Sequence, residues 1–373
     1  MREQARSIRA GAVRATRPAA APPPGAPRAP ARGGYTELLD EVRAAGLLEK
    51  RPGYYGVLFA ILLALLAAAL TALVTLGPSP LQLLVAAALG VVLAQLGFLA
   101  HEAAHRQIFA SGRRNDLVAQ LLGPALVGLS FTWWVHDHNA HHGNPNVVGR
   151  DPSAAPGAFV FRPEDAAGRR GLAGDFARVQ GFALFPLLLL EGVNLHVRSL
   201  VALLRRRRSG LENLELALLA ARLVLLPVLV LAVLPPGLAV GFLGAQLAAF
   251  GLYLGGSFVP NHVGMPIIPA EQRLDYLSKQ VLTSRNLRGG RLMCLATGGL
   301  SLQIEHHLFP GMPRPNLLRV RPIVQAHCVR NGLPYTELPL LSAYGAVVAH
   351  LNRVGLAAGS AVRCPIAERC GRR

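Results

Sequence analysis

Two pairs of long apolar stretches constrain this chain to a fold that crosses a membrane. Residues 54–76 and 81–100 form the first pair, joined by a Gly-Pro-Ser-Pro turn, and residues 214–234 and 238–259 form the second, joined by Pro-Pro-Gly. An apolar helix needs about 20 residues to cross a bilayer, and each stretch has that length. We therefore predict an all-α integral membrane protein with four transmembrane helices in two hairpins.

Residues 181–204 are harder to assign. This segment begins apolar, but Glu191, His196 and Arg198 interrupt it well short of a membrane thickness, so we predict an interfacial helix. With four spans, every histidine cluster and the arginine run at 205–208 fall on one side, while both short turns on the other side carry no charge. The positive-inside tendency makes the histidine side cytoplasmic. Arg222, inside the third span, must snorkel, pair or face protein.

Composition agrees with one membrane-embedded catalytic unit. Of the 373 residues, 52% are hydrophobic and only 16% are charged. A formal net charge of +18 would suit nucleic-acid binding, but the apolar stretches exclude that reading, and the arginines are better explained as topology determinants that contact anionic lipid headgroups. The four cysteines form no CxxC pair, which argues against a zinc ribbon or a disulfide scaffold and favours a reducing compartment.

The ends differ from the body of the chain. Residues 1–35 are rich in Arg, Ala and Pro and are predicted to be a disordered arm, with a transit peptide as the alternative. The catalytic domain is expected at 36–345, with a C-terminal tail at 346–373. The expected location is a bacterial cytoplasmic membrane.

Histidines gather in clusters beside the apolar stretches. Residues three and four apart share one face of a helix, and imidazole is a common metal ligand, so such clusters can converge on an ion. His101 and His105 follow the second span, and His262 follows the fourth. Residue type and position give a candidate ligand set of His101, His105, His138, His141, His142, His196, His262, His306 and His307.

Nine imidazoles are too many for one ion, so we predict two metal ions on the cytoplasmic side. All-nitrogen donors suit zinc, copper, iron or nickel, and residue type alone does not choose among them. Asn261 and Gln303 are candidates for water-mediated or outer contacts with metal. His136 is off the helical spacing and His350 lies outside the clusters, so neither is expected to be a ligand.

One motif admits a different function. His101-Glu102-Ala103-Ala104-His105 also matches the HExxH signature of zinc peptidases, in which the glutamate is the general base. That interpretation leaves the other histidine clusters without a role.

Taken in order, five segments resemble the membrane fatty acid desaturase family: HEAAHRQIF (101–109), WWVHDHNAHHGNPNVVGRDP (133–152), EGVNLH (191–196), FVPNHVGMP (258–266) and QIEHHLFPGMPRPNL (303–317). The resemblance implies a four-span helical fold whose cap holds two iron ions, Fe2+ or Fe3+, with no catalytic residue beyond the metal ligands. It also implies that O2 and two electrons are used to remove two hydrogens from adjacent methylenes of an acyl chain, carried as acyl-CoA or phospholipid. Hydroxylation or epoxidation on the same scaffold is the alternative.

The sequence departs from the family pattern at three places. Gln303 replaces a histidine found in many relatives. The variation resembles both the front-end desaturases and a set of bacterial acyl desaturases, so it does not fix the double-bond position, and His196 could supply the missing ligand. Asp137 stands where a basic residue often precedes the second box, and Ser301-Leu302 replaces a more usual Asn-Tyr. Neither a haem-binding HPGG segment nor a GxGxxG fingerprint occurs, so electrons are expected from an external ferredoxin, cytochrome or flavin/iron–sulfur reductase.

Overall fold

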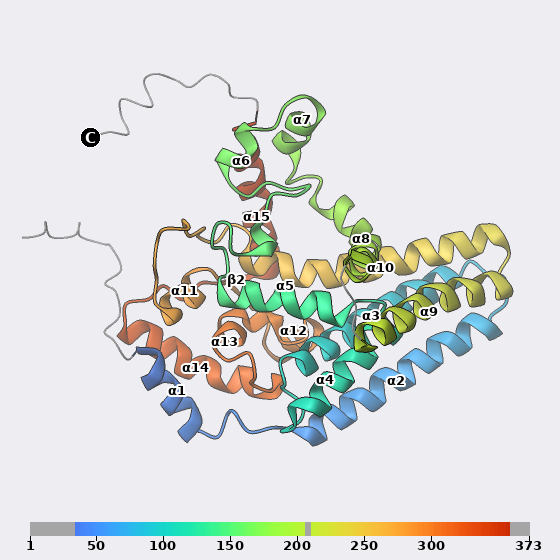
Figure 1. Ribbon diagram of the computed structural model, residues 1–373, viewed down its shortest axis with the longest axis horizontal. Helices are drawn as coiled ribbons and strands as arrows, with labels where there is room; N and C mark the ends of the chain where they lie inside the picture. Colours follow the sequence, from blue (N-terminus) through green and yellow to red (C-terminus); the bar gives the residue numbers. More distant parts are fainter. Residues whose placement is uncertain (1–33, 206–209, 359–373) are drawn as a thin grey trace, which may run out of the picture.

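The computed structural model describes residues 34–205 and 210–358, and these ranges are mostly helical (Figure 1). Two three-residue strands, β1 (Asn286–Arg288) and β2 (Glu337–Pro339), pair in parallel. The helical segments are, in order, α1 (Gly34–Ala44), α2 (Pro52–Thr75), α3 (Gln82–Ala104), α4 (Gly112–Leu121), the π-helix η1 (Leu122–Val127), α5 (Phe131–Gly143), η2 (Pro152–Ala154), α6 (Pro163–Ala167), α7 (Gly171–Val179), α8 (Leu184–Arg205), α9 (Gly210–Val233), α10 (Pro236–His262), α11 (Tyr276–Leu282), α12 (Gly290–Ala296), η3 (Leu300–Leu302), α13 (Gln303–Leu308), α14 (Arg314–Arg330) and α15 (Leu340–Gly355).

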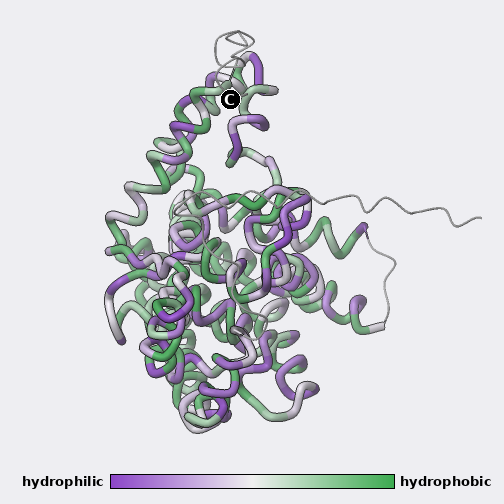
Figure 2. Tube along the Cα trace, turned by 90° about the vertical axis from the view of Figure 1, so that its left-hand side faces the viewer, coloured by the Kyte–Doolittle hydropathy of each residue, from purple (hydrophilic) through white to green (hydrophobic). Residues whose placement is uncertain are grey.

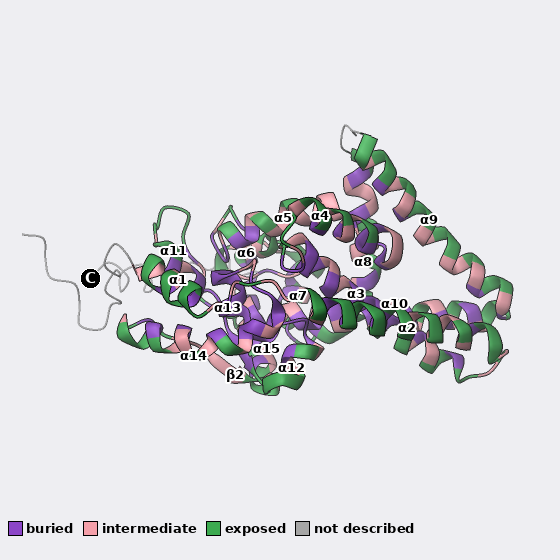
Figure 3. Cartoon of the chain, turned by 90° about the horizontal axis from the view of Figure 1, so that it is seen from below, coloured by how far each residue is buried: buried purple, intermediate pink, exposed green. Residues whose placement is uncertain are grey.

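Helices α2, α3, α9 and α10 correspond to the four predicted spans and extend to the same end of the molecule, with α9 inclined to the other three (Figure 1, Figure 3). Many of their outward-facing side chains are apolar and exposed, such as Ile61 on α2 and Leu225 on α9, as expected for helices that face lipid (Figure 3). Two of these helices continue past the predicted apolar stretch. His101 lies in the last turn of α3, and α10 ends at His262. The extensions place ligand candidates beyond the predicted apolar stretches.

Helix α8 does not settle the span count. Five described helices, α8 included, are long and apolar enough to cross a membrane, so the predicted number of four is not confirmed. In Figure 1, α8 crosses α10 rather than running beside it. The crossing is close because both helices have glycine there: a Cβ on Gly251 would lie 2.3 Å from the Gly192 nitrogen.

A sharp bend between α4 and α5 was not predicted. The segment Gly112–Val127 meets Phe131–Gly143 at 114°, an arrangement that fits a broken span or a re-entrant loop. Pro124 lies within η1 and Gly128 ends it with a positive φ of 87°, both of which disfavour a continuous α-helix. Arg222 donates a hydrogen bond from Nε to the Leu126 carbonyl at 2.7 Å. The arginine that interrupts the third span thus faces protein.

The other end of the molecule mixes hydrophilic and hydrophobic segments (Figure 2). An apolar core there joins α1, α11, α13 and α14. The first ten positions of the predicted tail, 346–355, belong to helix α15. Ala343, Val347, Leu351 and Val354 recur at helical spacing and are buried. The predicted disordered arm lies outside the described residues except for its last two positions, which begin α1, and arginines 206–208 also lie outside them.

Candidate metal centre

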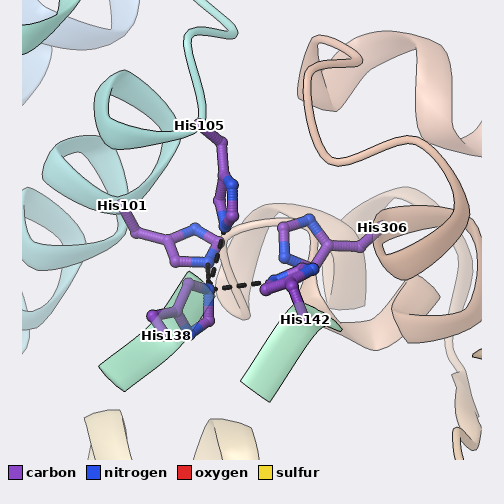
Figure 4. Close-up of side chains that lie close together, drawn as sticks. All are labelled: His101, His105, His138, His142 and His306. Atoms are coloured by element: carbon purple, nitrogen blue, oxygen red, sulfur yellow. Dashed lines mark hydrogen bonds between the residues drawn. The ribbon is translucent and has the colours of Figure 1, made fainter. Parts of the chain in front are cut away.

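Within the described part of the chain, histidine ring nitrogens converge in two groups. The first group draws on three helical segments, and its candidate ligand atoms all lie within 4.8 Å of one another (Figure 4). Its members are His101 and His105 at the end of α3, His138 and His142 on α5, and His306 on α13.

The spacing inside the first group is that of ligands around a shared ion. Nε2 of His138 lies 3.1 Å from Nε2 of His101, 2.9 Å from that of His105 and 3.0 Å from that of His142. One imidazole nitrogen offers either one proton or one lone pair, so it cannot form three hydrogen bonds. Metal–nitrogen bonds of about 2.1 Å at right angles place neighbouring nitrogens about 3.0 Å apart.

The second group consists of His141, His262 and His307. In each ring the far nitrogen, Nδ1, is fixed by an oxygen. His141 contacts the Asp151 carboxylate, His262 the Thr283 carbonyl and His307 the Gln280 side-chain oxygen, each at 2.9 Å. These contacts place the proton on Nδ1 and leave the Nε2 lone pair as the metal-binding position. In His262 that position has a neighbour in this structure, the Gln303 amide nitrogen at 2.9 Å.

Adjacent histidines on one helix serve different groups. His138 and His142 are four residues apart and share a face of α5, whereas His141 points to the second group. His306 and His307 divide in the same way on α13. Because one helix supplies both groups, two ions bound there would be close neighbours.

Burial favours the neutral form of His105, His306 and His307. Burial, and then the electrostatic interaction with His141, lowers the pKa of His105 to about 3. Burial is also the main cause that holds the pKa of His306 and that of His307 well below the usual value. The next cause is the electrostatic interaction with His105 for His306, and with His262 for His307. Nε2 of both rings is buried without a hydrogen-bond partner among residues 34–205 and 210–358. A neutral, unpartnered nitrogen is ready to bind a metal, so the residues present fit a metal pair.

Glu102, the possible general base of a zinc peptidase, is engaged elsewhere. Arg314 donates from Nε and Nη2 to its carboxylate at 2.6 and 2.5 Å, and both side chains are buried. Tyr55 adds a longer contact of 3.4 Å. A carboxylate held by a buried arginine is not free to take a proton from water. His101 and His105, the two histidines of the motif, belong to the group of five histidines. The peptidase interpretation is therefore disfavoured.

A cavity of about 380 Å³ adjoins both groups. His138, His141 and His262 line it, and apolar side chains of α8, of α10 and of the segments 154–161 and 263–267 line much of the rest, with Glu191 and Arg198 among them. Trp134 forms part of the wall and stacks on His138 with ring centroids 4.2 Å apart. The shape and lining suit a long apolar ligand placed next to the metal groups.

Comparison with known proteins identifies the family. Residues 78–339, more than two thirds of the chain, match the family model for fatty acid desaturases. The chain belongs to the fatty acid desaturase family. It is 29% identical to fatty acid desaturase 3 of Bos taurus over 88% of this chain and 76% of the relative, and 32% identical to the Delta(5) fatty acid desaturase fat-4 of Caenorhabditis elegans over 81% and 69%. A Delta(8)-fatty-acid desaturase of Helianthus annuus is 28% identical over 87% and 73%.

Membership makes this chain an oxidoreductase that acts on acyl chains. Animal and plant relatives give no support to the expectation of a bacterial membrane. Of the nine histidines predicted as desaturase ligands, the structure brings eight together.

His196 is the ninth, and it belongs to neither group. Its Nδ1 donates to the Gly128 carbonyl at 2.8 Å, and its ring stacks on Phe250 with centroids 5.7 Å apart. A Cβ on Gly128 would lie 2.9 Å from the ring, so glycine is needed at that position. His196 therefore fixes α8 to the bend between η1 and α5, a role that its chain position did not reveal.

Gln303 and Asn261, the predicted outer residues, lie beside the second group of this desaturase. The Gln303 amide nitrogen is 2.9 Å from His262 Nε2, and Asn261 donates to the Gln303 side-chain oxygen at 3.2 Å. His136 is exposed on α5 and His350 lines the large cavity; neither joins a group.

Sequence reasoning missed Gln280, Asp151 and Arg314. Gln280 lies on the short helix α11, which carries no metal motif, and Arg314 contacts Glu102 across 212 positions of the chain. Asp151 lies within one of the motif segments, but nothing in its spacing marked it as a partner of His141.

Proposed function

We propose that the protein is an O2-dependent fatty acyl desaturase with two iron ions. Two hydrogens leave adjacent methylenes of the acyl chain, and O2, two electrons and two protons are converted with them to two waters and a carbon–carbon double bond. The supporting observation is the pair of histidine groups at the side of an apolar cavity.

The proposed ligands are the eight clustered histidines. His101, His105, His138, His142 and His306 would hold one ion, and His141, His262 and His307 the other. Imidazole donors suit several metals, but breaking an unactivated C–H bond with O2 needs a redox-active one, which excludes zinc and favours iron. When bound, the two irons would supply an oxidant that no side chain can provide.

The chain's own residues would position the substrate and exclude water. Apolar side chains of α8 and α10 would hold the acyl chain in the large cavity, as acyl-CoA or acyl lipid. Trp134, packed on His138, would keep the reacting methylenes beside the first group. Asp151 and Gln280 would hold the rings of His141 and His307 at fixed angles.

The proposed topology has four spans, α2, α3, α9 and α10, with α8 at the interface and the histidine groups facing the cytoplasm. The crossing of α8 over α10 supports this arrangement. Two electrons would come from an external ferredoxin, cytochrome or flavin/iron–sulfur reductase. Turnover of the purified protein with NADPH alone would refute that part.

The function is tested by mass spectrometry of fatty acids, with double-bond localisation, from cells that express the chain beside a compatible reductase. The matched variants are His142→Ala and His136→Ala, which change the same residue type on the same helix. We expect a new unsaturated acid in the wild type and in His136→Ala, and none in His142→Ala. A hydroxylated product would show that the reaction is hydroxylation and not desaturation. An unsaturated product from His142→Ala would refute the proposed site.

A further inference from the structure

A second, smaller cavity lies beside the first histidine group and has no role in holding the acyl chain as proposed above. Its volume is about 50 Å³, and it lies between α3, the bent segment 112–134 and α10. His101 is the one member of the two histidine groups in its lining. In Figure 4, His101 enters its group from α3, on the opposite side from His306.

A wall of four side chains separates the two cavities. Leu129, Trp134, Leu254 and Phe258 line both of them. The large cavity reaches His138, His141 and His262, whereas the small one reaches His101. An acyl chain in the large cavity would cover the histidine groups on the side of that cavity. A small molecule could still approach the first group through the small cavity.

The small cavity is poorly suited to water. Ser130, a polar residue in its lining, is occupied: its hydroxyl contacts Glu215 at 2.5 Å and accepts from the Trp133 backbone N–H at 3.1 Å. Nδ1 of His101 lacks a partner among the described residues, and a buried water requires two to four polar partners rather than one. Apolar cavities in proteins take up apolar molecules such as xenon.

We propose that this cavity binds dioxygen and presents it to the first histidine group while an acyl chain fills the large cavity. The proposal rests on the proposed O2-dependent function. Dioxygen is apolar, so it favours hydrocarbon over water, and it is small enough for a cavity of about 50 Å³. The cavity adjoins α3 and α10, two of the proposed spans, so it is within reach of oxygen dissolved in the bilayer.

Gly97 on α3 offers a way to fill the cavity without disturbing its walls. A Cβ there would lie 3.7 Å from Leu254 Cδ1 and 3.8 Å from Val127 Cγ1, which is ordinary van der Waals contact with two lining side chains. Gly244 on α10 is the matched control, because a Cβ at that position meets nothing within 4 Å. Both substitutions replace glycine by alanine inside a long helix, so their effects on helix propensity are alike.

The first measurement is xenon binding to the purified protein by 129Xe NMR, with and without metal. We expect binding in the wild type and in Gly244→Ala, and weaker binding in Gly97→Ala. Ala119→Val, which approaches the cavity from α4, gives a second, independent filling variant. No difference between the filling variants and the control would overturn the assignment of the cavity as a gas site.

The second measurement is the dependence of turnover on O2 at saturating acyl substrate. We expect Gly97→Ala to raise the KM for O2 by about threefold, with the KM for the acyl substrate unchanged. An unchanged KM for O2, or a changed preference for acyl chain length in its place, would overturn the proposal. Acyl turnover that consumed no O2 would instead refute the proposed function, and xenon binding distinguishes the two failures because it requires no turnover.

Discussion

Gln280 accepts a hydrogen bond from Nδ1 of His307 at 2.9 Å, and its amide nitrogen donates to the backbone carbonyl of His142 at the same distance. One buried side chain therefore orients a ligand of the second histidine group and contacts the backbone of a ligand of the first. The angle of the His307 ring is set from outside the metal centre.

Replacing Gln280 with leucine should weaken metal binding at the second group. The apolar side chain cannot hold the His307 tautomer, and loss of such an outer contact typically costs 10- to 100-fold in metal affinity, so we expect a loss of about tenfold or more. Metal titration of the purified protein measures it. Gln280→Glu should keep most of the affinity, and exposed Gln272→Leu should keep all of it. Equal affinity in Gln280→Leu and the wild type would contradict this role.

The Glu102–Arg314 pair should show the behaviour of a buried ion pair. Arg314→Leu leaves a carboxylate buried without its partner, so we expect a loss of about 3–5 kcal/mol of stability. The double variant Glu102→Leu/Arg314→Leu should recover much of that loss, because no lone charge remains. Thermal unfolding in detergent measures both. If the double variant were as unstable as the sum of the two single variants, the charges would not be coupled as the geometry indicates.

A variant of His196 tests whether this residue is a metal ligand, as its chain position predicts, or a packing residue, as its contacts indicate. His196→Ala should retain both metal ions and lose about 1–2 kcal/mol of stability, because it removes a hydrogen bond and the packing on Phe250. Metal analysis beside thermal unfolding tests this. Loss of one ion from His196→Ala would restore His196 to the ligand set.

Removal of metal should destabilise the protein. A bound ion stabilises only the folded state, and its loss leaves the neutral, buried imidazoles without their partner. We expect the melting temperature to fall when a chelator is added to the wild type and to fall less in His138→Ala, in which the central ring of the first group is missing and only the ion of the second group is left to remove. Equal chelator effects in the two proteins would argue against an ion at His138.

The sequence predicts the long helices because hydropathy is a local signal, and α2, α3, α9 and α10 follow the predicted spans. It also predicts which histidines gather, since the i, i+3, i+4 spacing places His138 and His142 on one helical face. The spacing does not say that His141 serves another group, because that depends on the position of α13. Partners such as Gln280 and Arg314 come from distant parts of the chain, and η1 has no pattern of its own. His196 was predicted from its neighbourhood in the chain, whereas its contacts are with Gly128 and Phe250.

Metal content is the most direct measurement of the proposed centre. Purified wild-type protein should contain two iron ions for each chain, by elemental analysis with Mössbauer spectroscopy. His307→Ala should lose the ion of the second group and retain the other, whereas His136→Ala should retain both. A single ion, zinc in place of iron, or full occupancy in His307→Ala would contradict the account.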